Sequence, residues 1–561
     1  MTTANRSLEQ LEQAKREFGS NEAKLNRALS VLSRSAIKDA DELIRFHEAL
    51  LFFRAYPPTA SLLRQVESIL KTLPVQVAGL QDEDIDLSPL DDAEVSGIAG
   101  TTVTSNFSYA LVRWLTARYS RQISIDWDWF EEEERFGANM RRFLPLLEED
   151  AAVEAHVPYR KWIERATRGR RQLDWIIERI ESLQVETKSR AELYDALKLH
   201  VTWAFPLKAS RTAMKQPVRK VFFHKEPLIP RRDISLTTEL NSAPIPVTRL
   251  ARGEGEKMID LARATSAVRY RELHGFTYGD AARVLRADLG RGTEAYVMGV
   301  APENRLPLRA YHAALMLKNG VPVGYFEGIS IFERMESGFN LYYTFREGET
   351  AWLYARVLRL MRQLLGVTVF SIDPYQVGHE NEEGIESGAY WFYRKLRFRP
   401  VRRELLKLTE TEEEKIASRP NYRTSVRTLQ KLAAGHMLFE LRPSPTADWD
   451  GFEVRNLGLA VQQRMADRFA GKAEVMRAES IESVRKALGA KTSSWTQAEQ
   501  AAFENLALVF AIIPNLDHWD HREKELATDV IRAKAHPDEG RYLHLMQKHN
   551  RLREAMIKLG R

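Results

Sequence analysis

The stretch from Ser337 to Asp373 reads SGFNLYYTFREGETAWLYARVLRLMRQLLGVTVFSID, and its apolar residues change period twice. SGFNLYYTF is typical of a strand, and VTVFSID is a short apolar run typical of a buried strand. Between them GETAWLYARVLRLMRQLLG predicts one long helix, because apolar residues recur on one helical face: Trp352, Leu353, Val357, Leu358, Leu360 and Met361. The stretch therefore predicts a strand, a helix and a second strand.

The same alternation extends outward over Pro244 to Leu406. PVTRLA and EAYVMGVAP predict strands on either side of a helix, EKMIDLARATSAVRYREL. AYHAALMLKNGVPVGYFEGISIF predicts a hairpin, because Asn319-Gly320 supplies the two positive-φ residues of a type I′ turn. SGAYWFYRKL predicts a further helix, and FRPVRREL predicts the last strand. We expect one mixed sheet with flanking helices from this part of the chain.

The flanking regions have a helical period instead. Residues 1–213 contain several amphipathic stretches, such as Asp39–Phe53, which Pro57-Pro58 ends. Residues 214–243 are basic, contain proline and predict an extended connector. The sheet region then covers 244–408, and 409–561 predicts a second helical region. The expected fold class is a multidomain α+β protein, with a central mixed sheet between two mainly α-helical regions.

Composition narrows the function classes. Hydrophobic residues make up 44% and charged residues 29% of the chain, as in ordinary globular proteins, and no apolar run is long enough to span a membrane. The chain has no cysteine, which excludes disulfides, thiolate metal sites and cysteine nucleophiles and fits a cytoplasmic location. The net charge of +6 is small for this length, so we expect no nucleic-acid partner. Adjacent Asp517, His518, Asp520 and His521 suit a polar turn, and we expect no metal.

The order of strands and helices between Pro244 and Leu406 resembles that of the GNAT superfamily of acyl-CoA N-acyltransferases. Three local signatures carry the resemblance. LMLKNGVPVGYFEG, Leu315–Gly328, is similar to the family's hairpin. Arg346–Glu349 is similar to the short glycine-containing loop that opens a long helix. AYWFYRKLRF, Ala389–Phe398, is similar to the family's penultimate helix, where an alanine is followed four residues later by a tyrosine.

The loop signature implies where coenzyme A would bind. The first turn of a helix has unpaired N–H groups and a positive dipole end, which together suit a pyrophosphate, and a glycine permits close approach. Here Arg346 stands only two residues before Gly348, so the loop is shorter than the family's usual form, and Glu347 and Glu349 must point away from a bound anion. The resemblance assigns the acyl-CoA contacts to Tyr343, Phe345, Arg346, Gly348, Glu349, Thr350 and Ala351.

The resemblance also implies catalytic positions. Tyr393 takes the place of the tyrosine that protonates the departing thiolate, and Asn340 takes the place of a glutamate in the strand before the loop, with Glu336 four residues earlier. Other groups for the base are Glu327, His379-Glu380 or a chain of waters. Arg397 replaces the family's usual glycine, so the turn after the helix is either built differently or strained.

These expectations define a function. An acyl-CoA, most simply acetyl-CoA, would be the donor, and an amine of a small molecule or a protein would attack its thioester. Two alternatives stay open: a binding or scaffold protein that has lost the chemistry, and a transferase that uses an aminoacyl-type donor.

Overall fold

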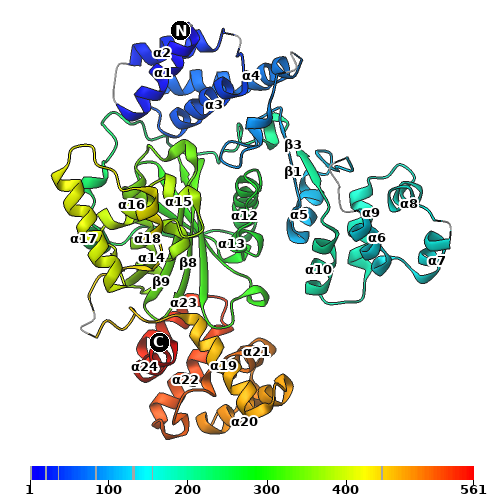
Figure 1. Ribbon diagram of the computed structural model, residues 1–561, viewed down its shortest axis with the longest axis vertical. Coiled ribbons are helices and arrows are strands. Elements are labelled where there is room, and N and C mark those ends of the chain that lie inside the picture. Colours follow the sequence, from blue (N-terminus) through cyan, green and yellow to red (C-terminus); the bar gives the residue numbers. More distant parts are fainter. Residues whose placement is uncertain are drawn as a thin grey trace.

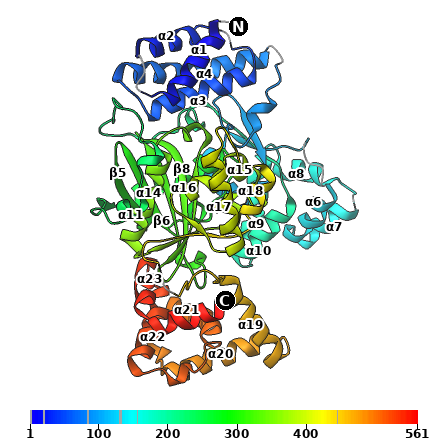
Figure 2. The same ribbon diagram turned by 60° about the vertical axis from the view of Figure 1, so that its left-hand side comes forward.

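The computed structural model describes residues 3–18, 22–35, 37–82, 85–128, 133–154, 156–443 and 446–561. A central sheet lies between a group of N-terminal helices and a group of C-terminal helices, and a separate lobe projects from its side (Figure 1). The view in Figure 2 gives the same order of parts. Among the described residues, no helix has the length and apolar character needed to cross a membrane.

The N-terminal helices share one hydrophobic core with the central sheet. Phe46, Phe52 and Leu62 belong to the same buried cluster as residues of the sheet and of the C-terminal helices. The hairpin tip is held from this side, because the Asn319 amide donates to the Ala55 carbonyl over 2.8 Å. The four helices are α1 (Thr3–Arg16), α2 (Glu22–Leu32), α3 (Ala40–Ala55) and α4 (Ala60–Asp82).

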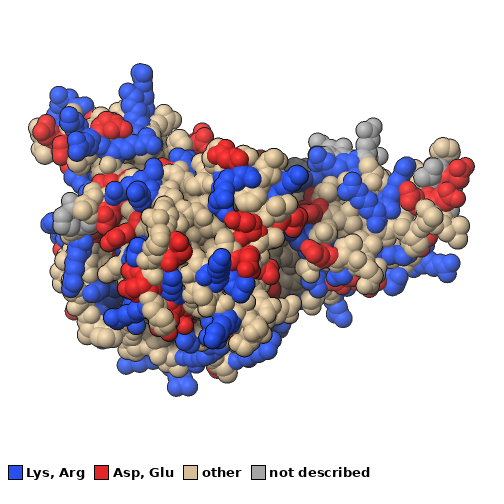
Figure 3. Space-filling view, turned by 90° about the horizontal axis from the view of Figure 1, so that it is seen from below, with Lys and Arg blue, Asp and Glu red and all other residues tan. Residues whose placement is uncertain are grey.

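The lobe has a core of its own, built around residues such as Ile176 and Trp203. It contains a small antiparallel sheet in the order β1-β3-β2, which sequence analysis did not anticipate. On the face shown in Figure 3, basic and acidic side chains are interspersed over both the body and the lobe. The lobe's elements are β1 (Thr102–Ser105), α5 (Tyr109–Tyr119), β2 (Ile123–Ile125), α6 (Glu133–Met140), α7 (Leu146–Glu154), α8 (Tyr159–Thr167), α9 (Gln172–Ser182), α10 (Thr187–Leu197) and β3 (Val201–Ala204).

The central sheet has nine strands in the order β11-β12-β10-β9-β8-β7-β6-β5-β4. Neighbours are antiparallel except β9 and β10, which are parallel, so the sheet is mixed as expected. The strands are β4 (Val247–Arg249), β5 (Leu285–Gly290), β6 (Thr293–Gly299), β7 (Ala310–Lys318), β8 (Val321–Ile331), β9 (Arg334–Leu341), β10 (Val369–Ile372), β11 (Arg399–Pro400) and β12 (Met437–Glu440).

Helices cover both faces of this sheet. Apolar residues of α12 and α13 pack on one face, together with Tyr296 and Leu315 of the strands. The parallel strands β9 and β10 are joined by α14, which packs on the other face with α16 (Figure 1). The helices of this part are α11 (Leu236–Leu240), α12 (Arg252–Ala267), α13 (His274–Thr277), α14 (Thr350–Leu365), α15 (Glu382–Glu386), α16 (Ala389–Lys395), α17 (Arg403–Ser418) and α18 (Val426–Leu432).

The hairpin between β7 and β8 turns at the expected residues. Asn319 has φ of 48° and Gly320 has φ of 80°. A Cβ atom at Gly320 would lie 2.0 Å from the carbonyl oxygen of Gln216, so this position also requires the absence of a side chain. The long strands of this hairpin form the centre of the sheet.

The parallel strands β9 and β10 pair over a short distance only. Arg334, Met335 and Glu336 lie opposite Val369, Phe370 and Ser371. The following residues of β9 stay paired with β8 as far as Leu341, while β10 ends at Ile372. The two strands therefore separate toward their carboxyl ends and leave a gap in the sheet.

The C-terminal region packs against the opposite end of the sheet. The Tyr542 hydroxyl donates to the Leu308 carbonyl over 2.7 Å, and Gln547 donates to the carbonyls of Phe332 and Leu365. Its helices are α19 (Val454–Phe469), α20 (Ala473–Leu488), α21 (Gln497–Phe510), α22 (His521–Lys534), α23 (Glu539–Lys548) and α24 (Asn550–Gly560).

Two strand expectations differ from the structure at the end of the sheet. FRPVRREL is a strand only at Arg399–Pro400, and α17 begins at Arg403. The remaining strand position beside β10 is filled by β12, which lies beyond residue 408. Pro400 has no N–H to donate, which limits a ladder at that edge.

A buried cluster of charged and polar side chains joins helix α3 to Arg211 and to Thr344, which follows β9. Glu48 of α3 is 2% exposed, and its carboxylate accepts from Arg211 at 2.6 and 3.1 Å and from the Thr344 hydroxyl. Burial alone would raise the pKa of Glu48, but the Arg211 guanidinium and the His47 hydrogen bond hold the pKa below its ordinary value. The carboxylate is therefore charged inside the core, and its stability depends on Arg211.

We predict that Arg211→Ala lowers the free energy of unfolding by about 3–5 kcal/mol, because it leaves the buried Glu48 carboxylate without its cation. Chemical denaturation followed by circular dichroism measures the change. Arg252→Ala removes an exposed pair with Glu256 and is the control, with no change expected beyond error. The double variant Glu48→Gln/Arg211→Met removes both charges of this pair and recovers much of the loss. Equal stability of Arg211→Ala and the control contradicts the prediction.

Candidate functional site

A cavity of about 670 Å³ opens where β9 and β10 separate. Its floor is formed by the outer half of β9 and by β8, and its sides by the start of α14, by α15 and by α16. The loop after β10 and the segments before α11 and α13 close the rim. The wall includes Pro230, Arg231, Arg271, Glu272, Tyr325, Glu327, Gly338, Phe339, Asn340, Leu341, Arg346, Gly348, Thr350, Ala351, Tyr375, Gln376, Glu383, Phe392 and Tyr393.

Six of the ten residues assigned by resemblance lie in this wall: Asn340, Arg346, Gly348, Thr350, Ala351 and Tyr393. The other four point elsewhere. Phe345 is buried in the core with 1% exposure, whereas Tyr343 is 51% exposed. Glu349 is buried among cations, and Glu336 lies opposite Ser371, where β9 and β10 are still paired. The structure thus gathers residues from three sequence segments in one cavity.

The start of α14 presents its positive end to the cavity. Its first amide groups have no acceptor within the helix, and the dipole favours an anion here. Both neighbouring carboxylates are engaged away from this end. Glu347 pairs with Lys15 at 3.2 Å and Arg16 at 2.7 Å. Glu349 pairs with Arg291 at 2.6 Å and with the buried Lys318 at 3.3 Å.

Gly348 is required by close packing. A Cβ atom there would lie 2.6 Å from the Tyr56 hydroxyl and 3.0 Å from the Phe345 carbonyl oxygen. Tyr56 comes from the end of α3, so this glycine lets the N-terminal helices approach the loop. A bulky residue at Gly348 would therefore disturb the packing as well as any ligand contact.

Tyr393 lies on α16 with its ring among Tyr354 and Phe398, at centroid distances of 5.7 and 5.6 Å. The side chain is 3% exposed, and burial raises the pKa of its phenol above the ordinary value. Within the described residues, no hydrogen bond holds its hydroxyl. The phenol is therefore protonated at neutral pH and available to a molecule in the cavity.

Asn340 lies on β9 opposite Tyr325 of β8. Its Oδ1 atom is buried and has no hydrogen-bond partner in the part of the chain that the structure describes. A buried acceptor without a partner costs about 1–3 kcal/mol, so this oxygen favours a ligand that brings a donor.

Glu327 of β8 is the carboxylate of the cavity floor. The Tyr311 hydroxyl donates to it and in turn accepts from the Gly275 amide at 3.2 Å. Burial raises the pKa of Glu327, although the hydrogen bond from Tyr311 acts in the opposite direction. His379 and Glu380, the other side chains considered as a base, are exposed and lie outside the cavity wall. Sequence analysis named Glu327 only as one of several alternatives for the base.

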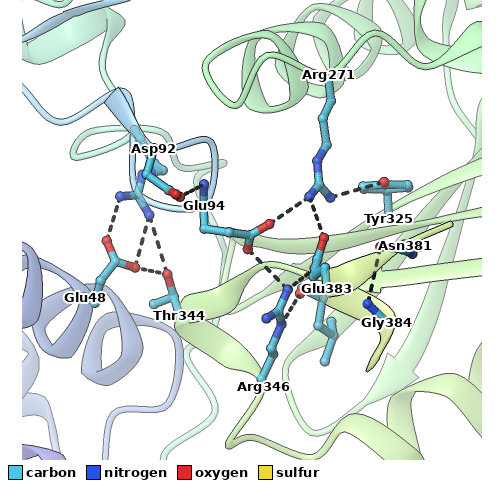
Figure 4. Close-up of polar contacts among 12 residues, drawn as sticks. Glu48, Asp92, Glu94, Arg271, Tyr325, Thr344, Arg346, Asn381, Glu383 and Gly384 are labelled. Atoms are coloured by element: carbon cyan, nitrogen blue, oxygen red, sulfur yellow. Dashed lines mark hydrogen bonds and ion pairs between the residues drawn. The ribbon is translucent and has the colours of Figure 1, made fainter. Parts of the chain in front are cut away.

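Four charged side chains, Arg271, Glu94, Arg346 and Glu383, form a cluster at the rim (Figure 4). Arg271 pairs with Glu94 at 2.7 Å and with Glu383 at 3.3 Å. Arg346 pairs with Glu94 at 3.2 Å and also with Glu383. The four residues come from four separate segments of the chain, and no sequence motif joins them.

Arg231 lines a second, basic cavity of about 380 Å³ as well as the first. Arg232, Lys395 and Arg397 also line it, with Asp233 as the acidic residue. Arg397 has φ of 72°, so the turn that lacks the family's glycine is strained. A basic surface therefore continues from the main cavity along the end of α16.

The polar residues near 517–521 serve the local fold. Asp520 caps α22 in a reciprocal arrangement with Glu523, and His521 lies 3.3 Å from Glu525. Over the described ranges, no group of three or more potential ligand residues is arranged to hold a metal ion.

Searches of family models, of curated proteins and of solved structures found no match to this chain.

Two glycines of the cavity wall give a prediction about packing. Gly348→Ala should lower the free energy of unfolding by about 1–3 kcal/mol, because the new methyl group overpacks against Tyr56. Gly338→Ala is the matched control: the nearest atom to its Cβ is Gln376 Nε2 at 3.6 Å, an ordinary contact. The control should be stabilised by roughly 0.5–1 kcal/mol, since alanine loses less entropy in a strand. If denaturant titrations show the same change in stability for both variants, Gly348 is not required by its packing against Tyr56.

Proposed function

We propose that this protein is an acyl-CoA-dependent N-acyltransferase in which an amine attacks the thioester directly. One observation carries the proposal: the gap between β9 and β10 brings the free end of α14 and the unpaired Tyr393 hydroxyl into one cavity. Such a transfer requires a site that binds the pyrophosphate of the donor and a group that gives a proton to the departing thiolate. The resemblance of the strand and helix order to GNAT enzymes supports the same function.

The donor would enter along the basic surface. Its pyrophosphate would accept from the first amides of α14 beside Gly348 and Thr350, and Arg346 would add a guanidinium. The nucleotide end would extend past Arg231 toward the second cavity, where Arg232 and Arg397 offer further cations. The acyl end would then reach the gap between the strands, near Asn340 and Tyr393.

The reaction then uses three groups. Glu327, as the carboxylate, takes a proton from the attacking amine, and a bond forms between the nitrogen and the thioester carbon. Main-chain N–H groups of β9 beyond Glu336 have no partner strand on the β10 side and would stabilise the oxyanion. When the carbon–sulfur bond breaks, the thiolate takes the proton of the Tyr393 phenol. The acceptor is an amine that fits between Glu327 and the charge cluster.

The assay for this proposal incubates the protein with acetyl-CoA and a panel of amines and follows the released thiol. We predict that Tyr393→Phe lowers turnover by about 10²–10⁴-fold with little change in the affinity for acetyl-CoA, because only the acid is lost. Tyr390→Phe is the matched control. Its hydroxyl bonds with Thr409 and lies outside the cavity wall, so it should cost stability and leave turnover unchanged.

Three outcomes would contradict the proposal or its assignment. Full activity of Tyr393→Phe removes the acid role. Calorimetry that detects no binding of coenzyme A or acetyl-CoA favours a scaffold protein. Transfer from an aminoacyl donor alone favours the other transferase class.

A further prediction concerns pH. A base must be deprotonated, so kcat/KM should rise with pH through the raised pKa of Glu327 and level off above it. Glu327→Gln keeps a hydrogen-bonding partner for Tyr311 but should lose about 10²–10⁴-fold in rate and this limb of the profile. Glu336→Gln, outside the cavity wall, is the control. An unchanged profile in Glu327→Gln would assign the base to another group.

A further inference from the structure

A second, smaller cavity lies where the C-terminal helices meet the sheet. Its volume is about 130 Å³, and it shares no wall residue with the cavity described above. Strands β5 to β7 form one side, and Leu364 and Leu365 at the end of α14 form another. Residues 537–539, where α23 begins, close it. This place lies at the lower edge of the sheet in Figure 1, where α23 is labelled.

His312 of β7 lines this cavity and has a buried ring nitrogen without a partner among the described residues. The side chain is 7% exposed and lines the wall. Its Nδ1 atom is buried and has no hydrogen-bond partner among the described residues. Burial lowers the pKa of His312, so the imidazole is neutral at pH 7 and can donate one hydrogen bond. The fold leaves this buried nitrogen to be satisfied by a molecule in the cavity.

Three arginines line the same cavity: Arg249, Arg283 and Arg305. Arg305 is locked in place, because it donates to the carbonyls of Val300, Lys534, His536 and Pro537 at 2.7–3.2 Å. The Arg283 guanidinium makes no hydrogen bond or ion pair within the described ranges. It is therefore a cation without a counter-ion among the described residues, in the wall of the same cavity as the imidazole.

The acidic residues of the wall are already engaged. Asp538 caps α23 by accepting from the Gly540 amide at 2.9 Å. Glu539 pairs with the buried Lys534 at 2.5 Å. The rest of the wall is apolar and includes Leu285, Val297 and Val300. The cavity thus combines spare positive charge and one unpaired ring nitrogen with an apolar lining, in a volume that holds only a few heavy atoms.

We propose that this cavity binds a small monocarboxylate with a short alkyl chain. One carboxylate oxygen accepts from the ring N–H of His312, and the other pairs with Arg283. The alkyl chain lies against Leu285 and Leu365. The bound acid fastens the C-terminal helices to the sheet, since its wall belongs to both parts.

The test uses the full chain and sodium butyrate as the probe. Butyrate should raise the melting temperature saturably, because a ligand of the folded state stabilises it. Butylamine hydrochloride and sodium chloride, at equal ionic strength, should not raise it: the first has the same chain with the opposite charge, and the second has neither a carboxylate nor an alkyl chain. Absence of a butyrate shift overturns the proposal, as does an equal shift with sodium chloride or butylamine.

Variants of residues in the cavity wall test whether butyrate binds in this cavity. Arg283→Gln should weaken butyrate binding at least tenfold in calorimetry without unfolding, since this side chain makes no hydrogen bond or ion pair within the described ranges. His312→Phe should have the same effect on affinity, and Arg283→Gln decides the matter if His312→Phe fails to fold. Arg286→Gln, three residues after Arg283 on β5 and paired outside the cavity with Glu294, should bind butyrate normally. Normal binding by Arg283→Gln overturns the assignment.

Discussion

The separation of β9 from β10 is the constraint on which the candidate site depends. Parallel strands of a buried sheet normally stay paired, but here only three residue pairs form before the strands diverge. The sequence explains the end of β10: Pro374 cannot donate to a ladder, and Asp373 caps the 3₁₀ turn that follows. Because β9 stays paired with β8, the gap opens on one side only. The gap opens the outer half of β9 to the cavity.

Cations near the start of α14 pair with the two neighbouring carboxylates, so that an anion can bind in the gap. Two carboxylates flank Gly348 in sequence, and either would oppose a phosphate if it faced the cavity. The fold draws Glu347 to the cations of α1 and draws Glu349 into the core, where Lys318 and Arg291 meet it. Burial lowers the pKa of Lys318 to about 8, despite the opposing effect of Glu349, so the lysine is mostly protonated at neutral pH. Four ion pairs, two at each carboxylate, thus direct negative charge away from the helix end.

Sequence patterns predicted those helices, strands and turns that depend on residues close together in the chain. The helix of 350–365, its neighbouring strands and the Asn319-Gly320 turn follow from periodicity and turn chemistry, which act over a few residues. Six of the ten proposed site residues lie in the cavity wall because they follow those elements directly. Long-range pairing was not predictable in this way. The strand β12 fills its place in the sheet from beyond α17, and the three short strands of the lobe have too few residues for a periodic signal.

The charge cluster at the rim also depends on long-range contacts that the sequence did not predict. It affects how a ligand can bind at the start of α14. Glu94 reaches Arg346 across more than 250 residues of chain, so one wall of the cavity depends on the segment that joins the N-terminal helices to the lobe. In the proposed function, a pyrophosphate at α14 competes with Glu94 and Glu383 for the Arg346 guanidinium. Arg271 still pairs with both carboxylates when Arg346 turns to the ligand, so neither is left without a cation. The second arginine therefore makes the exchange of partners possible at little electrostatic cost.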